Sequence, residues 1–159
     1  EKLSAKHFGN IQLKSGELRI NCDGRLVGAK FVINMRSITN QDIESKQYKA
    51  MLVDDLKSSR FFDVEKYPEA IFELLRSTPL GNNKFNLLGQ LNIKGKLAPV
   101  NIPIELKYKD NGKVIAVGEC SFDRTKYGLK YGSNSFFDNL GDEAISDIIR
   151  LEFEIELEK

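Results

Sequence analysis

The sequence predicts an all-β fold, an antiparallel barrel or sandwich. Hydrophobic and polar residues alternate along most of the 159-residue chain, and short turn-forming segments separate the alternating runs. Alternation with a period of two places every second side chain on the same face of a strand. One apolar face opposite one polar face is typical of an antiparallel sheet that is covered on one side only.

The clearest strand pattern lies near the C-terminus. Its apolar positions are Ile149, Leu151, Phe153, Ile155 and Leu157. Its polar positions are Arg150, Glu152, Glu154, Glu156 and Glu158. Similar patterns predict strands at residues 8–20, 25–37, 69–77, 84–94, 98–108, 113–123 and 148–158. Seven strands are awkward for a closed up-and-down barrel, because an even number lets the first and last strands pair antiparallel.

Turn signals support this division of the chain. Asp23-Gly24 and Asn111-Gly112 are strong hairpin dipeptides, since both residue types adopt positive φ at low cost. A bend is expected at Gly16 inside the first strand. Pro103 lies inside a strand pattern and predicts a bulge or an unpaired position, because proline has no N–H to donate.

One segment has helical spacing instead. From Ser45 to Ser58, the apolar residues Tyr48, Met51, Leu52 and Leu56 recur on one side, which predicts an amphipathic helix inserted after the second strand. A shorter helical turn is expected between Asp142 and Asp147.

Composition indicates one domain over residues 1–159, with 41% hydrophobic and 30% charged residues. The net charge of +1 gives no general attraction to nucleic acid or to an anionic membrane. No apolar run approaches the roughly 20 residues of a membrane helix, and no signal segment opens the chain. Cys22 and Cys120 leave two alternatives open, one disulfide or two free thiols.

Catalytic signatures are not evident, and we expect a protein that is not an enzyme. His7 is the only histidine and has no cysteine beside it, so no metal site is predicted. The chain contains no nucleophile elbow, P-loop or dinucleotide fingerprint, and no cofactor is expected.

Two adjacent phenylalanine pairs stand in polar segments, Phe61-Phe62 and Phe136-Phe137. Loops are usually polar because their backbone must meet water. Each pair therefore either folds back onto the core or covers an apolar cavity, and the sequence leaves both alternatives open.

Several blocks resemble the YceI-like family of bacterial proteins. They are HFGNIQLKSGEL, FVINMRSIT, LKSSRFFDVEKYPEAIFEL, LLGQLNIKGKLAPV and SFDRTKYGLKYGSNSFFDNLGDEAISD. The resemblance implies a lipocalin-like, eight-stranded antiparallel barrel that holds a polyisoprenoid, an isoprenoid quinone or a similar lipid. It also implies a periplasmic or secreted location. Family members carry a further strand ahead of the block that starts at His7, where this chain has only EKLSAK, so the first strand is expected to be missing or truncated.

The first functional hypothesis is therefore a carrier of one long apolar amphiphile in the barrel interior. The residues expected to contact the ligand are Phe31, Ile33, Met35, Leu52, Leu56, Phe61, Phe62, Phe72, Leu74, Leu87, Leu91, Ile102, Ile104, Phe122, Phe136 and Phe137. Candidate contacts to a polar head group are His7, Arg124 and Asn134, although Arg124 could instead form a salt bridge with Asp123 or Asp138. The alternative is a ligand-free interaction module that uses an exposed sheet edge or the loops with the phenylalanine pairs, for example to form a homodimer.

Overall fold

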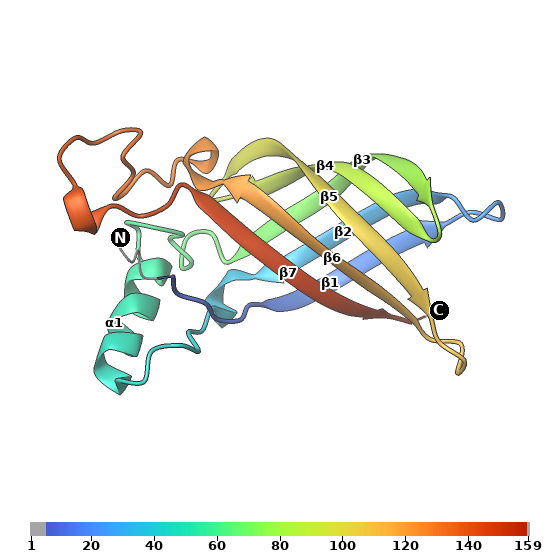
Figure 1. Cartoon of the computed structure of the whole chain (residues 1–159), viewed down its shortest axis with the longest axis horizontal. Coiled ribbons are helices and arrows are strands. Elements are labelled where there is room, and N and C mark those ends of the chain that lie inside the picture. The colour runs from blue at the N-terminus through green and yellow to red at the C-terminus, as the bar shows by residue number, and fades with distance from the viewer. Residues whose placement is uncertain (1–5, 159) are drawn as a thin grey trace.

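The computed structural model describes residues 6–158 and consists of one seven-stranded sheet, wound into an open barrel, with one inserted helix (Figure 1). Each strand pairs antiparallel with the strands before and after it in the chain. The predicted fold class, an antiparallel all-β fold with one helix after the second strand, is confirmed.

The strands are β1 (Gln12–Ile20), β2 (Leu26–Asn34), β3 (Glu69–Gly81), β4 (Lys84–Ile93), β5 (Lys96–Tyr108), β6 (Val114–Asp123) and β7 (Ile148–Leu157). The helices are α1 (Lys46–Lys57) and three short 3₁₀ turns, η1 (Met35–Ser37), η2 (Arg124–Tyr127) and η3 (Gly141–Glu143). All seven predicted strands are present, and their ends differ from the predicted ends by up to four residues.

The first strand starts later than its sequence pattern predicts, at Gln12 rather than at residue 8. Residues 8–10 instead pair with residues 39–41: the Thr39 N–H donates to the carbonyl of Asn10, and the Gln41 N–H donates to that of Phe8, both at 2.9 Å. The backbone hydrogen-bonding groups near residue 8 thus find their partners in a loop and not in a neighbouring strand.

The predicted helix is confirmed as α1, and Ser45 caps it by accepting a hydrogen bond from the Tyr48 N–H at 3.4 Å. The helix α1 covers one end of the barrel. None of its residues is fully buried, and Tyr48 and Met51 are exposed. The helical turn predicted for residues 142–147 is wrong for most of that range: η3 ends at Glu143, and its C-cap residue already has extended backbone angles.

The barrel does not close on itself. Six antiparallel pairings link seven strands, and each pairing reverses the strand direction, so β1 and β7 run the same way. The two edge strands are not hydrogen-bonded to each other within residues 6–158. The missing strand that we expected concerns residues ahead of Lys6, which lie outside the described part of the chain.

Pro103 marks a second interruption of the pairing. It sits opposite Asn86 of β4 without a register shift, whereas β5 pairs with β6 only from Ile104 onward. The predicted unpaired position is therefore found, and the alternative of a bulge at Pro103 is not. In β1, register shifts fall between Leu13 and Ser15 and between Arg19 and Ile20, on either side of the bend predicted at Gly16.

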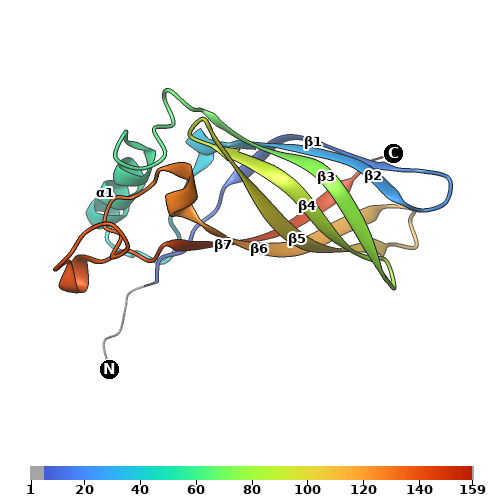
Figure 2. The same ribbon diagram turned by 90° about the horizontal axis from the view of Figure 1, so that it is seen from above.

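The connections divide the barrel into two different ends. Residues 6–11, 35–68 and 124–147 all lie at the end where β1 starts and β2 finishes, which we call the helical end (Figure 1 and Figure 2). The opposite end carries the short hairpin connections β1–β2, β3–β4 and β5–β6. Side chains that could regulate access to the interior are therefore concentrated at the helical end.

Candidate ligand-binding site

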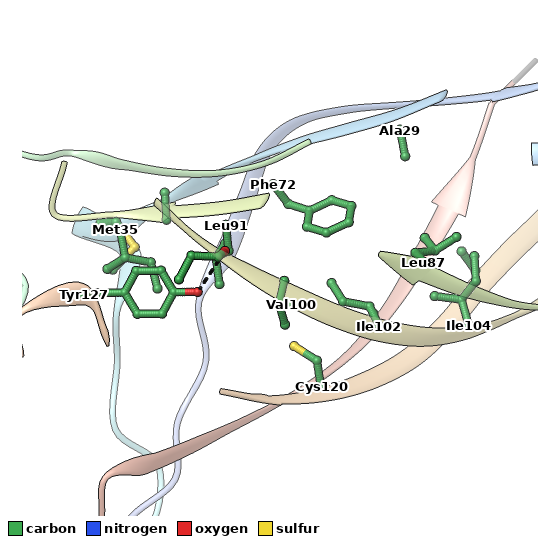
Figure 3. Packing of buried hydrophobic residues seen from close by; sticks show 14 of the residues in the cluster. Ala29, Met35, Phe72, Leu87, Leu91, Val100, Ile102, Ile104, Cys120 and Tyr127 are labelled. Carbon is green, nitrogen blue, oxygen red and sulfur yellow. Dashed lines mark hydrogen bonds between the residues drawn. The ribbon is translucent and has the colours of Figure 1, made fainter. Parts of the chain in front are cut away.

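One face of the sheet is apolar on all seven strands, and we call it the inward face. Cross-strand partners point to the same side of a sheet, so the register traces this face from Leu13 opposite Ile33 to Gly118 opposite Phe153. It includes Leu13, Leu18, Ile20, Ala29, Phe31, Ile33, Phe72, Leu74, Phe85, Leu87, Leu91, Ala98, Val100, Ile102, Ile104, Leu106, Ala116, Cys120, Phe122, Leu151, Phe153 and Ile155. Figure 3 shows part of this packing, with side chains from different strands meeting inside the barrel.

Burial falls from the middle of the sheet to its edges. Phe72 and Leu87 in the central strands are 3% and 2% exposed, whereas Leu13 and Ile20 on β1 are 39% and 38% exposed. The inward residues of β7 are likewise only partly buried. Apolar surface therefore remains accessible along the opening between the two edge strands. We call this opening the seam; it is bordered by Leu13, Leu18, Ile20, Leu151, Phe153 and Ile155.

The helical end of the interior is filled by the protein's own side chains. Met35, Val64, Tyr127 and Leu129 come from the connections at this end and are all buried in the core cluster. The Tyr127 hydroxyl donates to the carbonyl of Ala98 at 3.5 Å (Figure 3), and burial raises the pKa of Tyr127 to about 12. A ligand has more accessible apolar surface at the seam than at this end.

The two phenylalanine pairs have different environments. Phe61 is 6% exposed, and its ring centroid lies 5.8 Å from that of Phe62 and 6.4 Å from that of Tyr131. Phe136 and Phe137 are 47% and 50% exposed. The first pair thus folds back toward the core, which was one of the two alternatives, while the second pair faces solvent. Contact between either pair and a ligand stays a prediction.

Arg124 is completely buried and holds the long β6–β7 connection together. Its guanidinium donates to the carbonyls of Ser146 at 2.8 Å and Ile145 at 3.0 Å, and also to that of Leu129. The carboxylate of Asp147 lies 3.5 Å away. Burial lowers the pKa of Arg124, and the charge of Asp147 opposes that shift.

This cation also joins the two loops that carry the phenylalanine pairs. The Cζ atom of Arg124 lies 5.4 Å from the centre of the Phe61 ring, a cation–π distance. On the surface above, the Cζ atom of Arg60 lies 4.7 Å from the centre of the Tyr131 ring. Arg124 does form the salt bridge expected as an alternative, but its partner is Asp147 and not Asp123 or Asp138. Backbone carbonyls accept its other hydrogen bonds.

His7 anchors the segment that leads into β1. Its Nδ1 lies 2.8 Å from the carboxylate of Asp42, which also accepts from the Phe8 N–H at 2.9 Å and from the Asn40 amide at 2.7 Å. These hydrogen bonds, that of His7 first, lower the pKa of Asp42 from 3.8 to about 2. A side-chain carbon at Gly9 would lie 1.7 Å from the carbonyl oxygen of Thr39, so only glycine fits there.

Sequence reasoning did not identify Asp42, Asn40 or Asp147 as partners of the polar candidates. His7 and Asp42 are separated by 35 residues, and nothing in their spacing predicts contact. Asn134, the third polar candidate, is exposed and lies between the buried Ser133 and the exposed Ser135. The structure does not bring the three polar candidates together. Arg124 and His7 each belong to a separate hydrogen-bond network.

The remaining candidates lie on α1 and on the strands. Leu52 and Leu56 are half-buried, and Leu56 packs against the core. Cys22 is exposed in the β1–β2 turn, Cys120 is buried on the inward face, and both thiols are free. Burial, followed by the charge of Glu119, raises the pKa of Cys120. In residues 6–158, no three His, Cys, Asp or Glu side chains gather as a metal ion would require.

A curled antiparallel sheet with an apolar inward face is the architecture of lipocalin-like binding proteins. The chain belongs to the YceI-like domain family, whose sequence profile matches residues 2–157. None of its described helices is long and apolar enough to span a membrane.

Solved structures agree with this assignment of the fold. The Burkholderia cenocepacia protein BcnA is 23% identical, with a TM-score of 0.70 over 91% of this chain and 83% of that one. The Campylobacter jejuni YceI protein is 21% identical, with a TM-score of 0.68 over 98% of this chain and 86% of that one. A mutant of the Campylobacter protein solved with a monobromobimane guest is 20% identical and has a TM-score of 0.72, over 98% of this chain and 86% of that one. No curated protein matches the sequence.

We predict that Asp42 makes the fold sensitive to acid. Because its pKa is lower in the folded protein than the ordinary value of 3.8, its stabilising effect is complete above pH 3.8 and is lost as the pH falls toward about 2. Urea unfolding at a series of pH values should show Asp42→Asn less stable than the wild type at neutral pH, with the difference shrinking through this window. Asp110→Asn, in the exposed β5–β6 turn, is the control and should follow the wild-type profile; identical profiles for all three proteins would contradict the assignment.

Arg124→Lys should destabilise the protein by about 2–4 kcal/mol, because an ammonium group cannot reach three carbonyls that a planar guanidinium bonds at once. The matched control is Arg150→Lys, whose side chain forms an exposed ion pair with Glu119 and should cost less than about 1 kcal/mol. Denaturant unfolding measures both, and equal effects at the two sites would show that Arg124 is not the organising cation.

Proposed function

We propose that the protein is a non-catalytic carrier that binds one long apolar amphiphile, such as a polyisoprenoid or an isoprenoid quinone, against its inward face. The observation that carries this proposal is the continuous apolar lining of all seven strands, left partly exposed along the seam. Proteins of this family and fold are generally binding proteins, which supports the same reading.

Hydrophobic burial would supply the affinity. Each 100 Å² of apolar surface removed from water contributes about 2.5 kcal/mol before the cost of ordering the ligand. A prenyl chain has no polar groups that would need partners inside the barrel. A ligand lying along the seam would cover the partly exposed side chains of β1 and β7 and reach the stacked rings of Phe31 and Phe72, whose centroids are 6.5 Å apart.

The polar end of the ligand would lie near the helical end in this proposal. The His7 side chain is 44% exposed, and Asn134 is exposed, so both can reach a head group. Arg124 is a weaker candidate, because its donors already bond the β6–β7 connection. Phe136 and Phe137 would cover the chain close to its head group.

From the family, we further infer a periplasmic or secreted location.

Two measurements test the carrier proposal. Solvent extraction of the purified protein followed by lipid mass spectrometry should recover a prenyl or other long-chain amphiphile. Titration with geranylgeraniol, followed by displacement of the neutral dye N-phenylnaphthylamine, should then show binding that Phe31→Ser weakens about tenfold, since a phenylalanine contributes roughly 1.5–3 kcal/mol on burial. Phe136→Ser and Phe137→Ser should have smaller effects.

Leu97→Ser is the matched control, because Leu97 is 61% exposed on β5 next to the inward Ala98. It should leave the affinity unchanged. Each variant is first checked for a cooperative unfolding transition. An empty lipid extract, together with equal dye and prenyl binding in Phe31→Ser and Leu97→Ser, would rule out the inward face as the ligand site.

A second candidate function is an interaction module. Within residues 6–158, the outer edges of β1 and β7 have no strand partner, and unpaired edges favour addition of another strand. Multi-angle light scattering across protein concentration should then show self-association that Leu18→Lys on β1 reduces. A monomer at all concentrations that takes up geranylgeraniol favours the carrier instead.

A further inference from the structure

One buried side-chain oxygen of the inward face has no hydrogen-bond partner. The hydroxyl Oγ of Ser77 is shielded from solvent, and no group in residues 6–158 forms a hydrogen bond with it. The other such oxygen in this part of the chain, Oδ1 of Asp147, lies 3.5 Å from the guanidinium of Arg124, which compensates its charge. Ser77 has no such compensation. Nearly all buried polar groups in folded proteins are hydrogen-bonded, because an unpaired one is destabilising.

The register of β3 and β4 directs Ser77 into the barrel. Ser77 pairs with Leu87, an inward residue that is 2% exposed, and cross-strand partners point to the same side of a sheet. Strict alternation from the inward Leu74 would instead place Ser77 on the outer face. The register shift between Leu74 and Arg76 removes that difference, as a β-bulge re-aims the side chains that follow it.

Ser77 is a polar exception on an apolar surface. Away from the strand ends, the other paired inward positions in residues 6–158 carry aliphatic or aromatic side chains, glycine, proline or the thiol of Cys120. A serine hydroxyl can both donate and accept a hydrogen bond. The side chain therefore offers a ligand inside the barrel a single directional contact among apolar ones.

This hydroxyl lies far from the helical end. The strand β3 starts at that end with Glu69 and rises about 3.3 Å per residue, so Ser77 is roughly 25 Å along it, in the half nearer the hairpin connections (Figure 1). In the proposed function the head group of the ligand lies near the helical end, beside His7 and Asn134. The part of the ligand that reaches Ser77 is then its chain, at a distance from the head group.

We propose that the Ser77 hydroxyl is a subsite for an oxygen atom on the chain of the ligand, remote from the head group. The ligand class is a long-chain amphiphile with a second oxygen function, such as a hydroxyl or carbonyl group toward its far end. This inference rests on the proposed carrier function and adds a selectivity to it. An oxygenated chain completes the hydrogen bond of Ser77, whereas a plain hydrocarbon chain covers the hydroxyl and leaves it unpaired.

The test compares palmitate with ω-hydroxypalmitate, two probes that share a head group and a chain and differ only in the terminal hydroxyl. Displacement of N-phenylnaphthylamine from the delipidated protein gives both affinities. The wild type should bind ω-hydroxypalmitate at least as tightly as palmitate, although a hydroxyl in an apolar site ordinarily weakens binding. Ser77→Ala should weaken the binding of ω-hydroxypalmitate about tenfold and change that of palmitate less than about twofold, because only the terminal hydroxyl loses a partner.

Three further measurements separate the hydrogen bond from a change of shape. Ser77→Thr keeps the hydroxyl and should keep the wild-type ratio of the two affinities. Ser121→Ala, at an exposed outward position of β6 opposite Arg150, is the matched control and should bind both probes as the wild type does. Without ligand, Ser77→Ala should unfold at the same urea concentration as the wild type or a higher one, because it removes an unpaired buried hydroxyl.

Two results would overturn the subsite and leave the carrier function standing. One is that palmitate binds but Ser77→Ala does not change the ratio of the two affinities. The other is a clear loss of stability in ligand-free Ser77→Ala, which would show that Ser77 already has a partner inside the protein. If palmitate, ω-hydroxypalmitate and geranylgeraniol all fail to displace the dye, the carrier function itself is wrong, and the subsite with it.

Discussion

The number of strands governs the rest of this structure. Seven strands joined by antiparallel pairings give edge strands β1 and β7 that run in the same direction, and the sheet curls without closing (Figure 1). Hydrophobic burial still drives the central strands together, so Phe72 and Leu87 are almost fully covered. The same force covers the inward residues of the edge strands less well, since within residues 6–158 each edge strand has a neighbouring strand on one side only. Accessible apolar surface is thus a direct consequence of the topology.

Two polar networks organise the helical end around this apolar interior. A buried cation such as Arg124 is tolerated because backbone carbonyls and Asp147 replace the water that it loses. The network of His7 and Asp42 ties the segment ahead of β1 to the loop that precedes α1. The first network fixes the carbonyls of Leu129, Ile145 and Ser146, and the second fixes residues 7–8 against residues 40–42. His7 and the buried Arg124 therefore each have a structural role in holding these loops.

The two faces of the sheet carry different chemistry. The inward face offers apolar area without charge, whereas the outward positions of β5, β6 and β7 carry charged residues such as Glu105, Glu119 and Glu154. The strict alternation of side chains along β5, β6 and β7 produces both surfaces from the same three strands.

Sequence alone was sufficient to predict the antiparallel all-β fold, the seven strands, the helix after β2 and the family, because these depend on local periodicity, turn residues and contiguous motifs. It also identified most of the inward face, since alternation fixes which residues share a side. It could not distinguish Phe61, which is buried beneath Arg124, from Phe136 and Phe137, which are exposed, because both pairs stand in similar polar segments. Those environments, and the contacts of His7 with Asp42 and of Arg124 with Asp147, emerge only in the three-dimensional fold. Each depends on which distant segments the curled sheet brings side by side, and that information is not present in local spacing.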